Sequence, residues 1–143
     1  MDEVVGYAPG VFDLFHVGHL DVLDRAAAVC DRLVVGVLGD EAAERLTGAR
    51  PVVPLIERME IVGAVRQVAE VVAVRDLDPA AAHAELGFTV AFAGCADAWS
   101  GPALEAALAG TGVRVVAFTG VAETASPVLR AALAGFEHEE SVA

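Results

Sequence analysis

The stretch PGVFDLFHVGH, residues 9–19, decides the fold of this chain. It follows an apolar run at residues 4–8 and precedes a helical pattern that begins at His19. A His-x-Gly-His element therefore stands where a first strand passes into a first helix. In open α/β sheets this junction binds phosphate, because unpaired backbone N–H groups and the helix dipole favour an anion at the helix N-terminus.

His16 and His19 are the candidate catalytic residues of this element. Side chains three residues apart lie on the same side of a helical turn. An imidazole can donate a hydrogen bond to charge that grows on a phosphoryl oxygen. We expect Gly18, between them, to let a ligand approach the backbone. A histidine pair of this kind is more often surface decoration or half of a zinc site, but the other histidines and the two cysteines do not stand at ligand-like spacing.

Composition narrows the class of protein. A chain of 143 residues with 56% hydrophobic residues predicts one globular domain. The net charge of −12 argues against nucleic-acid binding and against anionic membrane surfaces. No apolar run is long enough to span a bilayer, and the acidic start has no secretion signal. Two cysteines make no disulfide framework, so we expect a cytoplasmic protein.

Short apolar runs alternate with helical patterns, which predicts an α/β fold with a Rossmann-like, doubly wound, parallel five-stranded sheet. The expected strands are 4–8, 33–38, 71–74, 90–93 and 113–118. The expected helices are 19–30, 40–46 with Asp40 as its cap, 55–68, 79–86 after Asp78, 101–109 and 126–135. Residues 1–136 then form the domain, and we expect the acidic tail 137–143 to be disordered. Ligands bind at the carboxyl ends of such strands, so the loops 94–101 and 119–126 should border the histidines.

The histidine element closely resembles the signature of the cytidylyltransferase-like (HxGH) nucleotidyltransferases, nearest to enzymes of the glycerol-3-phosphate cytidylyltransferase type. Three further segments are similar to segments of this family: PVVPLIERMEIV at 51–62, RQVAEVV at 66–72 and GCADAW at 94–99. The resemblance extends from residue 4 to residue 134.

The resemblance implies nucleotidyl transfer from CTP, or from ATP, to a small phosphorylated alcohol such as glycerol 3-phosphate, with Mg²⁺ on the phosphates and pyrophosphate as leaving group. It also implies a homodimer. The nucleotide-binding residues it implies are Gly10, Val11, Phe12, Asp13, Gly18, Gly94, Thr124 and Ser126. The substrate-binding residues it implies are Arg58, Arg66, Asp97 and Trp99.

Several of these residues have a second, purely structural interpretation. Asp13 could orient a histidine or the loop backbone, or simply start the helix. The side chain of Phe12 suits the core better than a ligand. Arg58 and Arg66 could form ordinary surface ion pairs with nearby glutamates. Trp99 could stack on a base or ribose, or only anchor its loop.

Two departures from the family pattern concern the phosphate site. Thr47 stands where a lysine is expected. The segment before the last expected helix lacks the arginine of the family motif, and Glu123 adds a negative charge there. All nine basic residues of the chain are arginines. We therefore expect Arg50, with Arg45 near it, to provide the positive charge at the triphosphate. The alternatives are an adenylyltransferase of the same fold and a degenerate nucleotide-binding relative.

Overall fold

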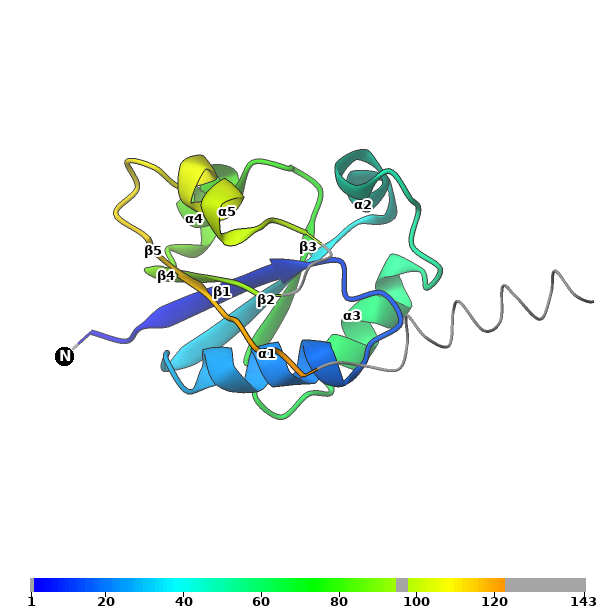
Figure 1. Cartoon of the computed structure of the whole chain (residues 1–143), viewed down its shortest axis with the longest axis horizontal. Coiled ribbons are helices and arrows are strands. Elements are labelled where there is room, and N and C mark those ends of the chain that lie inside the picture. Colours follow the sequence, from blue (N-terminus) through cyan, green and yellow to red (C-terminus); the bar gives the residue numbers. More distant parts are fainter. Residues whose placement is uncertain (1, 95–97, 123–143) are drawn as a thin grey trace, which may run out of the picture.

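In the computed structural model of the chain, which describes residues 2–94 and 98–122, five parallel strands form one sheet in the order β3-β2-β1-β4-β5 (Figure 1). The strands are β1 (Val5–Gly10), β2 (Arg32–Leu38), β3 (Glu70–Val74), β4 (Val90–Ala93) and β5 (Arg114–Ala117). The described helices are α1 (Val17–Ala27), α2 (Asp40–Thr47), α3 (Leu55–Gly63), α4 (Pro79–Leu86) and α5 (Gly101–Ala107). The predicted fold class is confirmed, and β4 has the predicted bounds.

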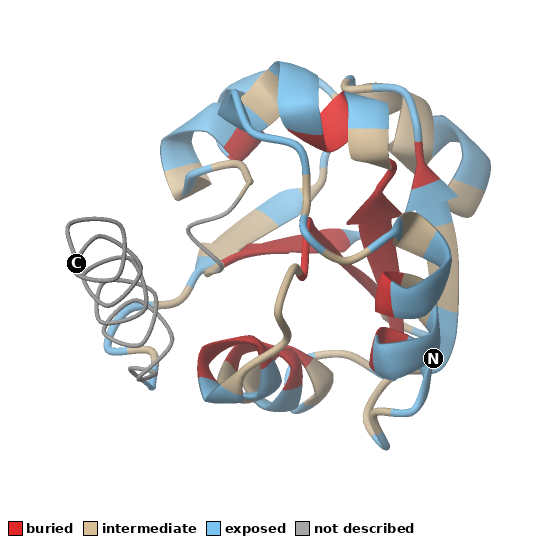
Figure 2. Cartoon of the chain, turned by 90° about the vertical axis from the view of Figure 1, so that its right-hand side faces the viewer, coloured by how far each residue is buried: buried red, intermediate tan, exposed pale blue. Residues whose placement is uncertain are grey.

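Helices cover the sheet on both faces, with α1 and α3 on one side and α2, α4 and α5 on the other. Neighbouring strand residues serve opposite faces because side chains alternate along a strand. Tyr7 packs in the cluster that includes Leu104 of α5, whereas Ala8 packs with Leu23 of α1. The central strands β1, β2 and β4 are therefore buried on both faces and appear in the sequence as continuous apolar runs, whereas the edge strands β3 and β5 are partly exposed (Figure 2).

Several helix ends differ from the prediction, among them the end of α5, which lies at Ala107 and not at residue 109. α1 begins at Val17, because His16 caps it, and it ends at Ala27, earlier than predicted. Asp40 is the first residue of α2 and not its cap, which is Gly39 without a side-chain bond. α3 ends at Gly63, where the N–H of Ala64 reaches the carbonyls of residues 60–62 in a tight turn. The apolar spacing continues to Val68 because the turn itself packs on the core.

Two helices begin as expected. Asp78 caps α4 by accepting a hydrogen bond from the N–H of Ala80 at 3.0 Å, ahead of a proline that suits the first helical turn. Ser100 caps α5 through the N–H of Ala103 at 3.2 Å. The expected helix 126–135 and the acidic tail 137–143 lie outside the described residues.

The sheet opens at the carboxyl end of β1. There β1 stays paired with β2 as far as Gly10 and Val37, but it pairs with β4 only at Gly6 and Tyr7. β1 and β4 are neighbours at the point where the strand order reverses, and a ligand crevice of an open α/β sheet forms at that switch point. The chain enters the histidine element directly from this end of β1.

Candidate active site

The loop that carries the histidines, residues 11–19, has an unusual backbone; we call it the histidine loop. Phe12 and Leu14 adopt left-handed φ values of 55° and 49°, which residues with a side chain rarely do. Each such residue costs about 1–3 kcal/mol and persists where the surroundings hold it. The ring of Phe12 is buried in the core, which agrees with its structural interpretation and leaves only its backbone for a nucleotide.

The two imidazoles lie face to face at the start of α1, with ring centroids 3.9 Å apart. Nδ1 of His16 accepts a hydrogen bond from the N–H of Gly18 at 3.0 Å, and Nδ1 of His19 accepts one from the N–H of His16 at 3.2 Å. The prediction that both rings point the same way is confirmed. The backbone N–H of Gly18, expected to be unpaired, is instead capped by His16.

These bonds fix the tautomer of both rings. Because each Nδ1 is an acceptor, the proton of each neutral ring lies on Nε2, and Nε2–H is the donor of each imidazole. The ring of His19 is 4% exposed and packs between Phe12 and Phe15. Orientation and tautomer are thus set by the fold before any ligand arrives.

Gly18 is required for a different reason from the one predicted. A Cβ at this position would lie 2.8 Å from Cε1 of His16 and 3.0 Å from the carbonyl oxygen of Ala122. The space over Gly18 is therefore filled by the protein itself, and the glycine admits the imidazole and a neighbouring loop.

Asp13 ties the histidine loop to a second segment of the chain. Its carboxylate accepts hydrogen bonds from the N–H groups of Val52 and Val53, each at 2.9 Å. The two acceptor oxygens fix the loop between α2 and α3, so Asp13 orients a loop backbone, as one of its predicted roles required. It does not bond a histidine in the contacts that the structure shows.

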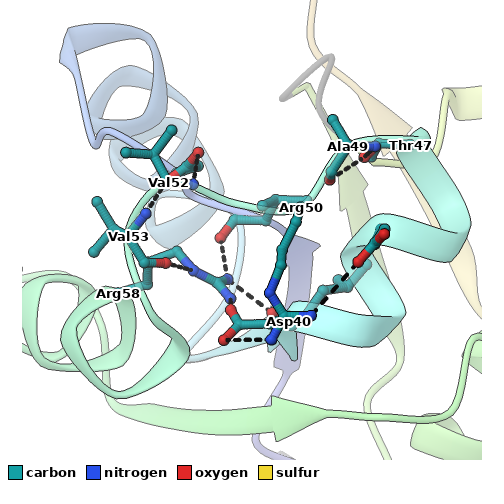
Figure 3. A network of polar contacts seen from close by, with 11 residues as sticks. Asp40, Thr47, Ala49, Arg50, Val52, Val53 and Arg58 are labelled. Carbon is teal, nitrogen blue, oxygen red and sulfur yellow. Dashed lines mark hydrogen bonds and ion pairs between the residues drawn. The ribbon is translucent and has the colours of Figure 1, made fainter.

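Arg58 does not lie on the surface. Among the described residues it pairs with Asp40 and not with the nearby glutamates that were expected; the contact with Asp40 is drawn in Figure 3. Its guanidinium, with an exposed fraction of 0%, bonds Asp40 at 2.6 Å and the carbonyl oxygens of Val11, Leu38 and Val53 at 2.7–2.8 Å. This position contradicts direct substrate contact by Arg58, because its donors are used inside the protein. The carbonyl oxygen of Val11 is in turn occupied by its hydrogen bond from Arg58.

The position of Arg58 could have been read from the helical spacing. Leu55, Arg58 and Val62 stand at i, i+3 and i+7, which places the arginine on the inward face of α3. An arginine in that stripe signals a buried polar role.

Arg50 lines a pocket of about 350 Å³ together with Arg45 and Arg75; we call it the arginine pocket. It lies where β2 and β3 end and α2 begins, with Asp40 in its wall. Arg50 is 58% exposed, and its ion pairs with Glu44 at 3.5 Å and Asp40 at 3.9 Å are loose. Arg75 is a lining residue that the sequence analysis did not single out, because it lies outside every recognised segment.

Thr47, at the position where the resemblance leads us to expect a lysine, is turned toward its own helix. Its hydroxyl donates to the carbonyl oxygen of Ala43 at 2.8 Å, which closes the last turn of α2. The N–H of Ala49 in turn donates to this hydroxyl at 3.3 Å. The side chain therefore serves the end of the helix.

Gly94 and Trp99 line a further pocket of about 320 Å³ at the carboxyl ends of β4 and β5. A Cβ on Gly94 would lie 3.0 Å from Val22 and 3.3 Å from Phe118, so this glycine allows α1 to approach the strand. Trp99 is half-buried and packs against the core while it borders the pocket, which keeps both of its predicted roles open. Asp97, Thr124 and Ser126 lie outside the described residues.

Arg66 lies away from the histidines. It is exposed in the turn that leads from α3 into the amino end of β3, whereas the histidines lie at the carboxyl edge. Glu70, one of its expected partners, instead pairs with Arg32 at 3.0 Å. Within this chain Arg66 does not join the other candidate residues.

Two further findings concern metals and membranes. Among residues 2–94 and 98–122, no three histidine, cysteine, aspartate or glutamate side chains gather closely enough to hold a metal ion. The helices in the same ranges are all too short or too polar to cross a bilayer.

Comparison with known proteins finds a family model and several relatives that match this chain. The family model described as cytidylyltransferase-like matches residues 7–118. The bifunctional protein HldE of Erwinia tasmaniensis is 41% identical over 85 residues, which are 59% of this chain and 18% of that protein. HldE of Methylococcus capsulatus is 51% identical over 65 residues, 45% of this chain and 14% of that protein. The chain thus spans less than a fifth of the length of these relatives.

Two solved structures share the fold. A lipopolysaccharide core biosynthesis protein from Thermoplasma volcanium superposes with a TM-score of 0.75 at 22% identity, over 85% of this chain and 100% of that chain. Pantothenate synthetase from Thermus thermophilus superposes with a TM-score of 0.60 at 16% identity, over 85% of this chain and 57% of that chain.

Proposed function

The chain belongs to the cytidylyltransferase-like family, and we propose that it transfers a nucleoside monophosphate from a triphosphate to the phosphate of a small alcohol. CTP is our first assignment for the donor, and glycerol 3-phosphate stands for the acceptor class. An oxygen of the acceptor phosphate attacks the α-phosphorus, the bond from that phosphorus to the bridging oxygen breaks, and pyrophosphate leaves. Such a step depends on positioning and electrostatics and needs no covalent enzyme intermediate.

The histidine pair is the observation that carries this proposal. Two rings held 3.9 Å apart, each with Nδ1 bonded to the backbone, present Nε2–H as their donor. Donors oriented in advance stabilise charge that develops on a phosphoryl oxygen, because no reorganisation is needed during the reaction. We assign Nε2–H of His16 and of His19 to the α-phosphoryl group and its bridging oxygen.

The arginine pocket supports the second part of the proposal. A chain of charge −12 repels a triphosphate at long range, so its site needs local positive charge. Three of the nine arginines line one pocket at the carboxyl edge. We propose that Arg50, assisted by Arg45, contacts the triphosphate in place of the family lysine. Its exposed ion pairs are weak enough for a phosphate to displace.

The described residues do not form a magnesium site of their own. Asp13 lies in the histidine loop and Asp40 in the wall of the arginine pocket, and both carboxylates are already bonded to the protein. We expect Mg²⁺ to enter with the triphosphate, since phosphate oxygens and water can provide its ligands. No step of the reaction is assigned to the metal.

A second candidate is adenylyl transfer by the same residues, because the histidines are assigned to phosphoryl oxygens, which CTP and ATP share. A third is a degenerate relative that binds a nucleotide without efficient turnover. The observation that favours it is the engaged hydroxyl of Thr47 at the position of the family lysine. A cytoplasmic location and a homodimer, with no nucleic-acid partner, complete the proposal.

Pyrophosphate release tests the function directly. The purified protein is incubated with Mg²⁺, one triphosphate at a time and a panel of phosphorylated alcohols that includes glycerol 3-phosphate and sugar phosphates. Release with CTP supports the first assignment, and release with ATP alone replaces it by adenylyl transfer. No release with any pair, while a nucleotide still binds, establishes the degenerate relative.

Trp99 offers a binding assay that does not depend on turnover. It is the only tryptophan and borders the pocket at β4 and β5. We expect CTP to shift its fluorescence and to raise the melting temperature more than ATP does, because a ligand that binds the native state stabilises it. Protection by ATP and not by CTP would reverse the choice of base.

A further inference from the structure

Two side chains of α1 hold the loop that follows β5, residues 118–122. Arg25 donates from Nη1 to the carbonyl oxygen of Thr119 at 2.7 Å and from Nη2 to that of Gly120 at 2.8 Å. Asp21 accepts a hydrogen bond from the N–H of Ala122 at 2.8 Å. These partners are 94–101 residues apart in the sequence. A loop at the far end of the described chain is thus fixed to the first helix.

Asp21 and Arg25 act as one unit. They stand at i and i+4 on α1, and the guanidinium bonds both carboxylate oxygens at 3.1 Å. The carboxylate therefore orients the fork of the guanidinium toward the two carbonyls. The hydrogen bond from Ala122 keeps the pKa of Asp21 below its usual range, with a further contribution from Arg25, so the carboxylate stays charged at neutral pH.

The loop so held reaches the histidines. The carbonyl oxygen of Ala122 lies 3.0 Å from where a Cβ of Gly18 would stand, beside the ring of His16. Gly18, Asp21 and Arg25 are spaced three and four residues apart, along one face of α1. One helix therefore carries the histidines at its first turn and sets the position of the loop against them.

We propose that Asp21 and Arg25 are positioning residues that hold the β5 loop as a wall of the nucleotide site. This inference rests on the proposed function, since it assigns the wall to the triphosphate that the histidines would contact. Neither side chain touches a reacting atom. Because Asp21 and Arg25 hold the loop in place before the nucleotide binds, binding need not order it. Removing either side chain should therefore lower nucleotide affinity more than the rate of the chemical step.

The chain offers a matched control. Arg32 is 39% exposed, close to the 36% of Arg25, and also makes two bonds, to Glu3 and Glu70 at 3.0 Å each. It lies at the amino end of β2, away from the histidines. A general effect of losing an exposed arginine would appear equally in Arg25→Ala and Arg32→Ala.

The test compares Arg25→Ala, Arg25→Lys and Arg32→Ala by steady-state kinetics and by residue-resolved amide exchange. We expect Arg25→Ala to raise KM for the triphosphate about tenfold with kcat changed less than about threefold, and to speed exchange at Ala122. Lysine should recover part of the loss, because an ammonium cannot match the fork of a guanidinium on two carbonyls. Arg32→Ala should leave KM unchanged.

Two results would overturn the inference: equal KM in the parent and Arg25→Ala, or equal changes in Arg25→Ala and Arg32→Ala. A parent that binds a triphosphate without turnover would refute only the proposed function. The inference would then be decided by the rise in melting temperature that CTP or ATP causes. This rise must be smaller in Arg25→Ala than in the parent, and unchanged in Arg32→Ala. A parent that binds neither triphosphate would overturn both.

Discussion

The histidine loop and the arginine pocket lie at the same edge of the sheet, yet the fold holds them in opposite ways. In the histidine loop, two residues have left-handed backbone angles, the imidazoles bond the backbone at the start of α1, and His19 is 4% exposed. In the arginine pocket, Arg50 is 58% exposed and its ion pairs measure 3.5 and 3.9 Å.

This difference matches the work that we assign to each region. Donors that stabilise a transition state must be oriented before the reaction, because reorganisation would add to the barrier. Cations that attract a phosphate can exchange one partner for another at little cost when they are exposed. Arg58 connects the two regions, since it bonds Val11 of the histidine loop and Asp40 of the arginine pocket.

The largest effect should follow when this connection is removed. Arg58→Met leaves the carboxylate of Asp40 without its closest partner and two buried carbonyls without their donor. We expect the free energy of unfolding to fall by about 3–5 kcal/mol, the usual result of breaking a buried ion pair on one side. Urea denaturation measures it, with the exposed Arg66→Met as control. A loss under about 1 kcal/mol would mean that the two regions are not joined through Arg58.

The next largest effect separates the two roles of the histidines, which cap α1 and are assigned as donors to the transition state. His16→Ala and His19→Ala should each lower kcat about 10²-fold or more, the scale for one lost transition-state donor. His16→Asn sharpens the test, because asparagine is a good helix cap but lacks the Nε2–H donor. It should keep the melting temperature close to that of the parent and still lose turnover. Near-normal turnover in folded His16→Ala and His19→Ala would refute the assigned mechanism.

Substitution in the arginine pocket should have a smaller effect and act on binding. Arg50→Ala should raise KM for the triphosphate about tenfold, equivalent to about 1.4 kcal/mol, with stability unchanged because its ion pairs are exposed. Thr47→Lys added to it should restore part of the affinity. An active enzyme that tolerates Arg50→Ala would rule out the replacement of lysine by arginine. An inactive parent that gains activity from Thr47→Lys would establish the degenerate relative.

Salt should produce the smallest effect. It compares the histidine loop with the arginine pocket in the unmutated protein. Between about 0.05 and about 0.5 M NaCl, we expect KM for the triphosphate to rise a few-fold, because exposed charges are screened over a Debye length that shrinks from about 14 to about 4 Å. Turnover at saturating nucleotide should change less than about twofold, since His19 is buried and His16 is half-buried. A salt-sensitive kcat with a constant KM would reverse the two assignments.

The amino-acid sequence by itself determined the layout of this protein. Strands buried on both faces appear as apolar runs, so residues 90–93 could be assigned to a strand without error. The Asp78-Pro79 start of a helix is likewise a local signal. The histidine element stands at the end of the first strand in the chain, so its place at the carboxyl edge followed from the topology alone.

Only the tertiary structure decided what each polar side chain bonds. Asp13 meets Val52 across 39 residues, and Arg25 meets Thr119 across 94, so neither partner could be found by local spacing. The inward place of Arg58 was visible in the helical period, but its four acceptors come from three separate segments. The physical reason is that secondary structure depends on local backbone and burial preferences, whereas a hydrogen bond needs two atoms about 3 Å apart, and chain folding alone brings distant atoms so close.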